Sequence, residues 1–230
     1  MTKFLFTPTP AAQDAPELSA VDKRAMRAIQ RMLTAMRRND HRPALHYAWI
    51  DAKGRQCSCD GFRAYRLNTP LPLDPRPANV GDGIDLDKVV PDIARNYEPI
   101  PLPTTDELQS YASIEREADG RKANLLWDFG PGRPVVNIPY LIDLMAIFPE
   151  VTHVYVSTTN GPVSPLYVKS ERGDAILLPV RCTEDRRAEN IRHHFDLLAA
   201  KYLAAVEANA EAAFSPDGFA ALARVAWQPC

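Results

Sequence analysis

The sequence predicts an α+β fold in which a unit of one strand, one helix and three further strands occurs twice and is followed by helices. Two observations carry this prediction. Residues 21–38 have the apolar spacing of an amphipathic helix, and alternating segments separated by turns follow them. A second helix is followed by three more predicted strands that end at residue 181, so the same order of elements occurs twice. The two units share no detectable sequence period, so the repeat is one of structure alone.

The composition is that of a globular chain with ample apolar residues for a core. The 230 residues are 46% apolar, which suits one domain with additions or two small domains. No stretch resembles a membrane span or a signal peptide, so a cytoplasmic location is expected. The formal net charge of −2 argues against a generally basic nucleic-acid coat, but it leaves room for a local basic patch.

The helix predicted at residues 21–38 separates apolar residues on one arc from cations on the other. Ser19 is its predicted N-cap, and Asp22 three residues later is the capping-box partner. The face opposite the apolar arc holds no acid and carries these cations: Lys23, Arg24, Arg27, Arg31, Arg37 and Arg38. Such a face is either ordinary solvated surface or a surface that meets phosphates, and the helix alone does not decide between them.

The other elements of the first unit are predicted from alternation and turn residues. Residues 3–6 are a candidate short strand before the helix. Three strands are predicted after it, at residues 44–51, 55–60 and 62–68, with a turn at 51–54. Residues 69–105 are rich in proline, which predicts a mostly irregular segment on the surface with at most one short helix, at about residues 86–95.

The second unit is predicted from residue 110 onward. A hairpin is expected with strands at 111–117 and 122–129 around a turn at 118–121, and residues 129–132 form a loop. Asn137 is the predicted N-cap of a helix that begins with Ile138 and Pro139 and stops before Pro149. Three strands follow, at 152–158, 164–169 and 175–181. A long helix at 183–214 and a short one after Pro216 complete the chain.

The cysteines and histidines do not form a metal or catalytic motif. Cys57 and Cys59 lack a second pair of ligands at zinc spacing, and their positions two apart in a strand predict small buried side chains. The histidines are scattered, and no Gly-rich phosphate loop or serine nucleophile elbow is present. Cys57 or Cys59 beside His46 is the best nucleophile that the sequence offers. The expectation is a protein without enzymatic activity, cofactor or metal ion.

Three segments resemble bacterial DNA polymerase III beta subunits, the sliding clamps. Residues 59–63 (CDGFR) resemble the Thr-Asp-Gly-His-Arg signature after the first strands of a clamp domain. Residues 136–145 (VNIPYLIDLM) resemble the segment in which an Asn precedes a Tyr-Leu helix start. Residues 164–168 (SPLYV) and 175–181 (AILLPVR) resemble the family's Ser-Pro strand and its closing strand. The resemblance covers roughly residues 3–181 and implies one clamp-like domain at 1–182, with a Pro-rich insertion at 69–109 and a C-terminal helical extension at 183–230.

In clamp domains two helices line the inside of a ring and antiparallel sheets form its outside. The resemblance therefore implies that the helices lie on one face of the sheets and that this set of cations faces duplex DNA: Lys23, Arg24, Arg27, Arg31 and Arg38. The second helix is expected to turn Tyr140, Asp143 and Ala146 outward, so only half of the lining is basic. With one domain per chain, a ring would need about six copies or another clamp-like partner, and a monomer is equally compatible with the resemblance.

The family also carries a hydrophobic pocket for short peptides of polymerases and other clamp users. Transferred residue by residue, its lining here is Cys59, Gly61, Phe62, Arg63 and Ala64 with Leu178, Pro179 and Val180. Phe62 stands for the family's His and Ala64 for its Leu, so volume and polarity differ. In the family the two segments belong to adjacent domains, so one domain would need a neighbour. The alternative is that these are ordinary core and edge residues.

Two functions of different kinds follow. The first is a sliding-clamp-like factor of DNA replication or repair, which oligomerises, contacts duplex DNA without reading its sequence and tethers DNA polymerase or other clamp-binding proteins for processivity. The second is a protein-interaction module on a clamp scaffold, which binds or imitates a clamp and does not use DNA.

Overall fold

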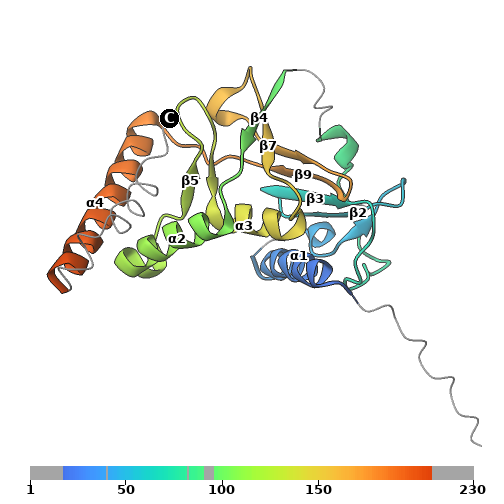
Figure 1. Ribbon diagram of the computed structural model, residues 1–230. Helices are drawn as coiled ribbons and strands as arrows, with labels where there is room; N and C mark the ends of the chain where they lie inside the picture. Colours follow the sequence, from blue (N-terminus) through green and yellow to red (C-terminus); the bar gives the residue numbers. More distant parts are fainter. Residues whose placement is uncertain (1–17, 40, 82, 91–95, 209–230) are drawn as a thin grey trace, which may run out of the picture.

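The computed structural model describes residues 18–39, 41–81, 83–90 and 96–208, which form an α+β protein (Figure 1). Four helices accompany a seven-stranded antiparallel sheet of order β1-β2-β3-β9-β8-β7-β4 and a separate β5–β6 hairpin. The helices are α1 (Ala20–Asn39), α2 (Thr105–Asp119), α3 (Ile138–Ile147) and α4 (Glu184–Ala208). The strands are β1 (Trp49–Ile50), β2 (Gln56–Cys59), β3 (Arg63–Leu67), β4 (Tyr97–Pro101), β5 (Leu126–Asp128), β6 (Val135–Asn137), β7 (His153–Ser157), β8 (Leu166–Lys169) and β9 (Gly173–Leu177).

The centre of the sheet is the antiparallel pair β3–β9, which joins the two halves of the chain. Its register runs from Arg63 opposite Leu177 to Leu67 opposite Gly173. Gly173 is required there, because a Cβ at this position would lie 2.0 Å from the carbonyl oxygen of Arg66. The strands β1–β3 that follow α1 and the strands β7–β9 that follow α3 therefore form one continuous sheet.

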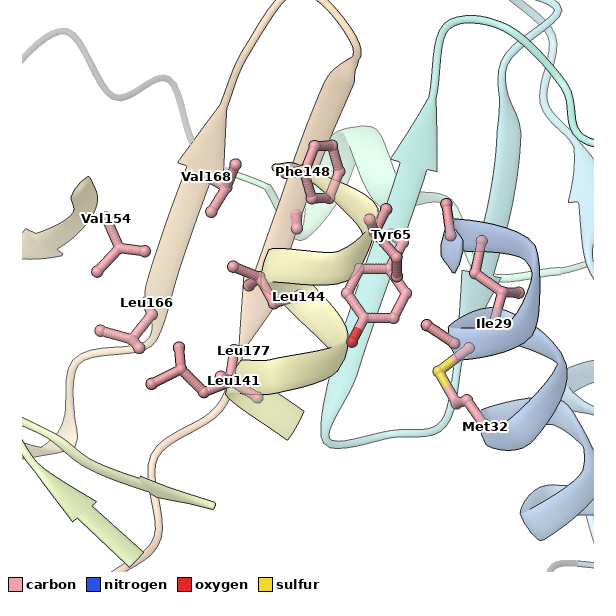
Figure 2. Close-up of a cluster of buried hydrophobic side chains, with 14 of the residues drawn as sticks. Ile29, Met32, Tyr65, Leu141, Leu144, Phe148, Val154, Leu166, Val168 and Leu177 are labelled. Carbon is pink, nitrogen blue, oxygen red and sulfur yellow. The ribbon is translucent and has the colours of Figure 1, made fainter. Parts of the chain in front are cut away.

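Helices α1 and α3 lie side by side against one face of this sheet (Figure 1). Figure 2 shows how Ile29 and Met32 of α1 and Leu141 and Leu144 of α3 point toward the strands around Tyr65. All five side chains are at most 1% exposed. Burying an aliphatic side chain of this size contributes roughly 1.5–3 kcal/mol, so the apolar arc of α1 is what fixes the helix on the sheet.

The opposite face of the sheet carries a second, smaller core cluster. Trp49, Cys57, Cys59 and Tyr167 are buried in it, and Leu86 from the Pro-rich segment packs against them. The prediction that Cys57 and Cys59 are small buried side chains is confirmed.

The start of α1 is the one predicted from the sequence. The amide of Asp22 donates to Oγ of Ser19 over 3.0 Å, and the Ser19 hydroxyl donates to the Asp22 carboxylate over 2.7 Å. Arg172 adds an ion pair to Asp22 at 2.6 Å, which ties the helix start to the β8–β9 turn.

The hairpin predicted between residues 111 and 129 is wrong, because residues 105–119 form α2. Thr104 and Glu107 make a reciprocal capping box, and Gly120, at φ +58°, ends the helix. Leu108, Ala112 and Glu115 share its buried face at spacings of four and three residues. The hairpin of this region lies later, between β5 and β6.

The strand predicted at residues 44–51 is shortened to β1 at Trp49–Ile50, because Pro43–Leu45 form a 3-10 turn. In the described part of the helix predicted at 86–95, the structure has a 3-10 turn at Leu86–Lys88, and residues 91–95 lie outside the described part of the chain. The Pro-rich segment also contributes β4, which no sequence signal predicted. Its prolines are tolerated because β4 is an edge strand that pairs with β7 alone.

The remaining predictions agree with the structure where it describes the chain. Strands β2, β3, β7 and β8 lie at the predicted places, whereas the strand predicted at 175–181 is shifted to β9 at Gly173–Leu177. Helix α3 begins after Asn137 and ends before Pro149, although the Asn137 side chain makes no capping hydrogen bond. The predicted strand at residues 3–6, the end of the long C-terminal helix and the helix after Pro216 lie outside the described residues. Within the described part, no helix has both the length and the apolar character needed to cross a membrane.

Candidate nucleic-acid interface

The outward face of α1 presents free cations. Arg24, Arg27 and Arg38 are exposed, and none of them makes an ion pair with a residue that the structure describes. Arg27 and Arg38 line a shallow depression on this face together with Gln30, Arg31, Thr34 and Ala35. The cations are presented because the apolar arc of α1 is buried on the opposite side.

Two members of the predicted DNA-facing set are less free than the others. The Arg31 guanidinium bonds to Asp143 of α3, although its side chain remains 60% exposed. Lys23 is half-buried and already has an interaction partner. Arg37, which was not in the set, donates to Asp74 and to the His46 carbonyl and lies over the Tyr47 ring. Three cations of this face therefore have no ion-pair partner among the residues that the structure describes.

The expectation that α3 turns Tyr140, Asp143 and Ala146 outward is wrong for Asp143. Asp143 is 7% exposed, while Tyr140 and Ala146 are half-buried against the core. The Asp143 carboxylate accepts hydrogen bonds from Arg31 of α1 and, over 2.8 Å, from Arg63 of β3. These two partners compensate its burial, so the junction of α1, α3 and β3 is an ion-pair network rather than a polar surface.

Arg63 is the centre of that network. It is 6% exposed, bonds to Asp60 at 2.9 Å and lies 4.1 Å above the Tyr140 ring. Burial opposes its charge, but the neighbouring Tyr65, Asp60 and Asp143 side chains outweigh burial and raise the pKa of Arg63, so the guanidinium stays charged. Its side chain is engaged inside the protein rather than offered to a peptide.

The two segments predicted to line a peptide pocket come together at one end of the β3–β9 pair. The amide of Leu178 donates to the carbonyl of Phe62 over 2.7 Å, and these two side chains are 38% and 60% exposed. The Phe62 ring lies 6.5 Å from that of Tyr140. We call Phe62, Tyr140 and Leu178 the Phe62 patch. It needs no neighbouring chain to bring both segments together.

The other predicted pocket residues are placed differently. Cys59 and Ala64 lie in the second core cluster, on the opposite face of the sheet from the helices. Gly61 occupies the β2–β3 turn at φ +87°, where the Asp60 carboxylate accepts from the Phe62 and Arg63 amides. Pro179 and Val180 are half-buried, and the Val180 amide bonds to Val135 of β6.

The thiols that the sequence offered as nucleophiles are held in the protonated form. Burial, reinforced by the Asp51 carboxylate, raises the pKa of the Cys57 thiol to about 12, and burial also raises the pKa of Cys59. Since the thiolate is the reactive species, both side chains are suited to packing and not to catalysis.

Sequence reasoning missed the structural role of Asp143. A signal for it exists, because Asp143 is the only charged residue in the ten residues of α3 and has apolar neighbours on both sides. An isolated acid in an otherwise apolar helix is expected to be paired when the helix is buried.

Searches against protein-family models, curated proteins and solved structures find no match for this chain.

Proposed function

We propose that this chain is a sliding-clamp-like factor that contacts duplex DNA through α1 and tethers replication or repair proteins. The observation that carries the proposal is the row of unpaired cations on α1, the helix that lies beside α3 on one face of the sheet. A rise of about 1.5 Å per residue separates Arg24 from Arg38 by roughly 21 Å along the helix axis, which is enough to follow several phosphates.

The order of elements supports the same proposal. The run β6-α3-β7-β8-β9 is a strand, a helix and three strands, and the run α1-β1-β2-β3 has the same order where the structure describes it. The β3–β9 pair joins the three strands that follow each helix into one sheet with both helices on one side, while β6 pairs with β5 outside that sheet. This is the arrangement that the motif resemblance to sliding clamps implies for a single domain.

Contacts of this kind position DNA without reading its sequence. With phosphate contacts from the three α1 cations that have no ion-pair partner among the described residues, the logarithm of the association constant should fall with the logarithm of salt concentration at a slope of about −2.7. Between 50 and 200 mM salt, duplex affinity is therefore expected to fall about 40-fold.

Fluorescence anisotropy with a labelled duplex measures this dependence, and two duplexes of unrelated sequence should give the same slope. Failure to bind at 50 mM salt, or binding that salt leaves unchanged, contradicts the proposal.

A protein-interaction module that does not use DNA is the second candidate, and two observations favour it. The Phe62 patch exposes apolar side chains, and Asp143 neutralises part of the basic face by pairing with Arg31. Light scattering measures the oligomeric state of the chain. A closed multimer would allow encirclement of DNA, whereas a monomer would restrict the chain to one-sided contact with DNA or to binding of a protein partner.

A further inference from the structure

The contact between α2 and α4 contains a group of ionisable side chains that the proposed DNA contact does not use. Glu115 and Asp119 are four residues apart on α2, so they share one face of that helix. His193 of α4 faces them. Near the start of α4, outside its contact with α2, Arg187 donates to Asp128 at the end of β5 and anchors the helix there.

The three side chains converge at distances suited to one metal ion. Nε2 of His193 lies 3.0 Å from Oδ2 of Asp119 and 3.8 Å from Oε2 of Glu115. One ligand atom from each residue lies within 4.8 Å of the others. Two ligands of a tetrahedral zinc ion at about 2.0–2.1 Å from the metal are about 3.3 Å apart, so small side-chain rotations suffice for coordination.

Glu115 provides an independent reason to expect a cation. It is only 2% exposed, and its Oε1 is bonded to Nδ1 of His194 at 2.6 Å. Its Oε2 is aimed at His193 and accepts no hydrogen bond from a residue that the structure describes. Its contact with Nε2 of His193, at 3.8 Å, is longer than a hydrogen bond, and a bound cation would give this buried carboxylate a closer partner on that side.

The surroundings of Glu115 resemble the outer shell of a metal site in their chemistry. His194 is buried and stacks on Tyr111 with ring centroids 3.7 Å apart, so the group that bonds to Oε1 is itself held in place. A hydrogen bond to the second oxygen of a ligating carboxylate orients it toward the metal. Asp119 and His193, with side chains 39% and 43% exposed, leave a route for the ion from solvent.

We propose that Glu115, Asp119 and His193 bind one Zn²⁺ ion and that this ion fastens α4 to α2. Two carboxylates balance the charge of the ion, and one imidazole with two carboxylates is a donor set that zinc accepts. Three protein ligands leave a fourth position for water.

The test uses the full chain after treatment with a chelator and dialysis. Isothermal titration with ZnCl₂ is expected to give about one ion per chain, and zinc is expected to raise the melting temperature. The substitutions Asp119→Asn and His193→Gln, both at partly exposed side chains, should each weaken zinc binding at least about tenfold and abolish the rise. His153→Gln, at an exposed histidine of β7, should leave both unchanged.

Cobalt distinguishes binding at this site from binding by cysteine thiolates. Co²⁺ bound by carboxylates and imidazole lacks the near-ultraviolet charge-transfer band of thiolate ligation. A thiolate band, or zinc binding that survives both substitutions, would overturn the proposal. The absence of zinc binding to the unsubstituted, chelator-treated chain would also overturn it. In the last case His193 and Asp119 simply share a direct hydrogen bond.

Discussion

Changing Arg24, Arg27 and Arg38 together to glutamate is expected to lower the affinity for duplex DNA about 500-fold at 0.1 M salt. Each phosphate contact contributes about eightfold at this salt concentration, and three contacts multiply. The substitutions should leave folding intact, because all three side chains are exposed and make no ion pair with a described residue. Anisotropy with the same duplex and circular dichroism measure the two quantities.

A matched control is the triple change of Arg121, Lys122 and Arg186 to glutamate. These exposed cations lie after α2 and on α4, and the variant has the same net charge as the α1 variant. The proposal requires that it keep most of its DNA affinity. Equal losses in the two variants would mean that net charge alone governs binding, and no loss in the α1 variant would favour the protein-interaction module.

Replacing Asp143 with alanine is expected to lower the free energy of unfolding by about 1.5–3 kcal/mol, the contribution of a hydrogen bond to a charged group. The reason is that Arg63 would stay buried and charged while keeping only Asp60 of its two carboxylate partners. Urea unfolding measured by fluorescence gives the change, with the slope of the transition checked against the original sequence.

Arg31→Ala is the control for this prediction, because it removes the other partner of Asp143 from a side chain that is 60% exposed. An exposed pair of this kind contributes about 0–1 kcal/mol, so the loss should be small. Similar losses in the two variants would show that the network acts through Arg31 and not through buried Arg63.

Much of the fold was predictable because its signals are local. Helix α1 has its period, its N-cap and its capping-box acid within twenty residues, and α3 has its proline start and proline stop within twelve. Strands β2 and β3 are separated by a turn that needs Gly61 at positive φ, and the sequence shows that glycine.

The rest depends on partners far away in the chain. Glu115 lies on the buried face of α2 because it is hydrogen-bonded to His194, 79 positions later. An acid at a buried position interrupts the apolar pattern by which the sequence would have predicted this helix. Asp143 turns inward because Arg63 and Arg31, 80 and 112 positions earlier, converge on it. Strand β4 carries two prolines and is recognisable only once its single neighbour β7 is known.

For the candidate interface, the positions of the cations were predictable and their ion pairs were not. The sequence placed all five cations on one helix face, but it could not show which of them are already paired. That depended on where α3 lies, because Asp143 reaches Arg31 only after the two helices pack together.

Photo-cross-linking from Gln30 tests most directly whether duplex DNA lies along α1. Gln30 is exposed and lines the same depression as Arg27 and Arg38, so replacing it with p-benzoylphenylalanine keeps every cation. The control carries the same group at Val163, which is 62% exposed in the turn between β7 and β8. We expect a salt-sensitive cross-link to duplex DNA from position 30 and none from position 163. Equal cross-linking from both positions, or cross-linking from 163 alone, would contradict the account.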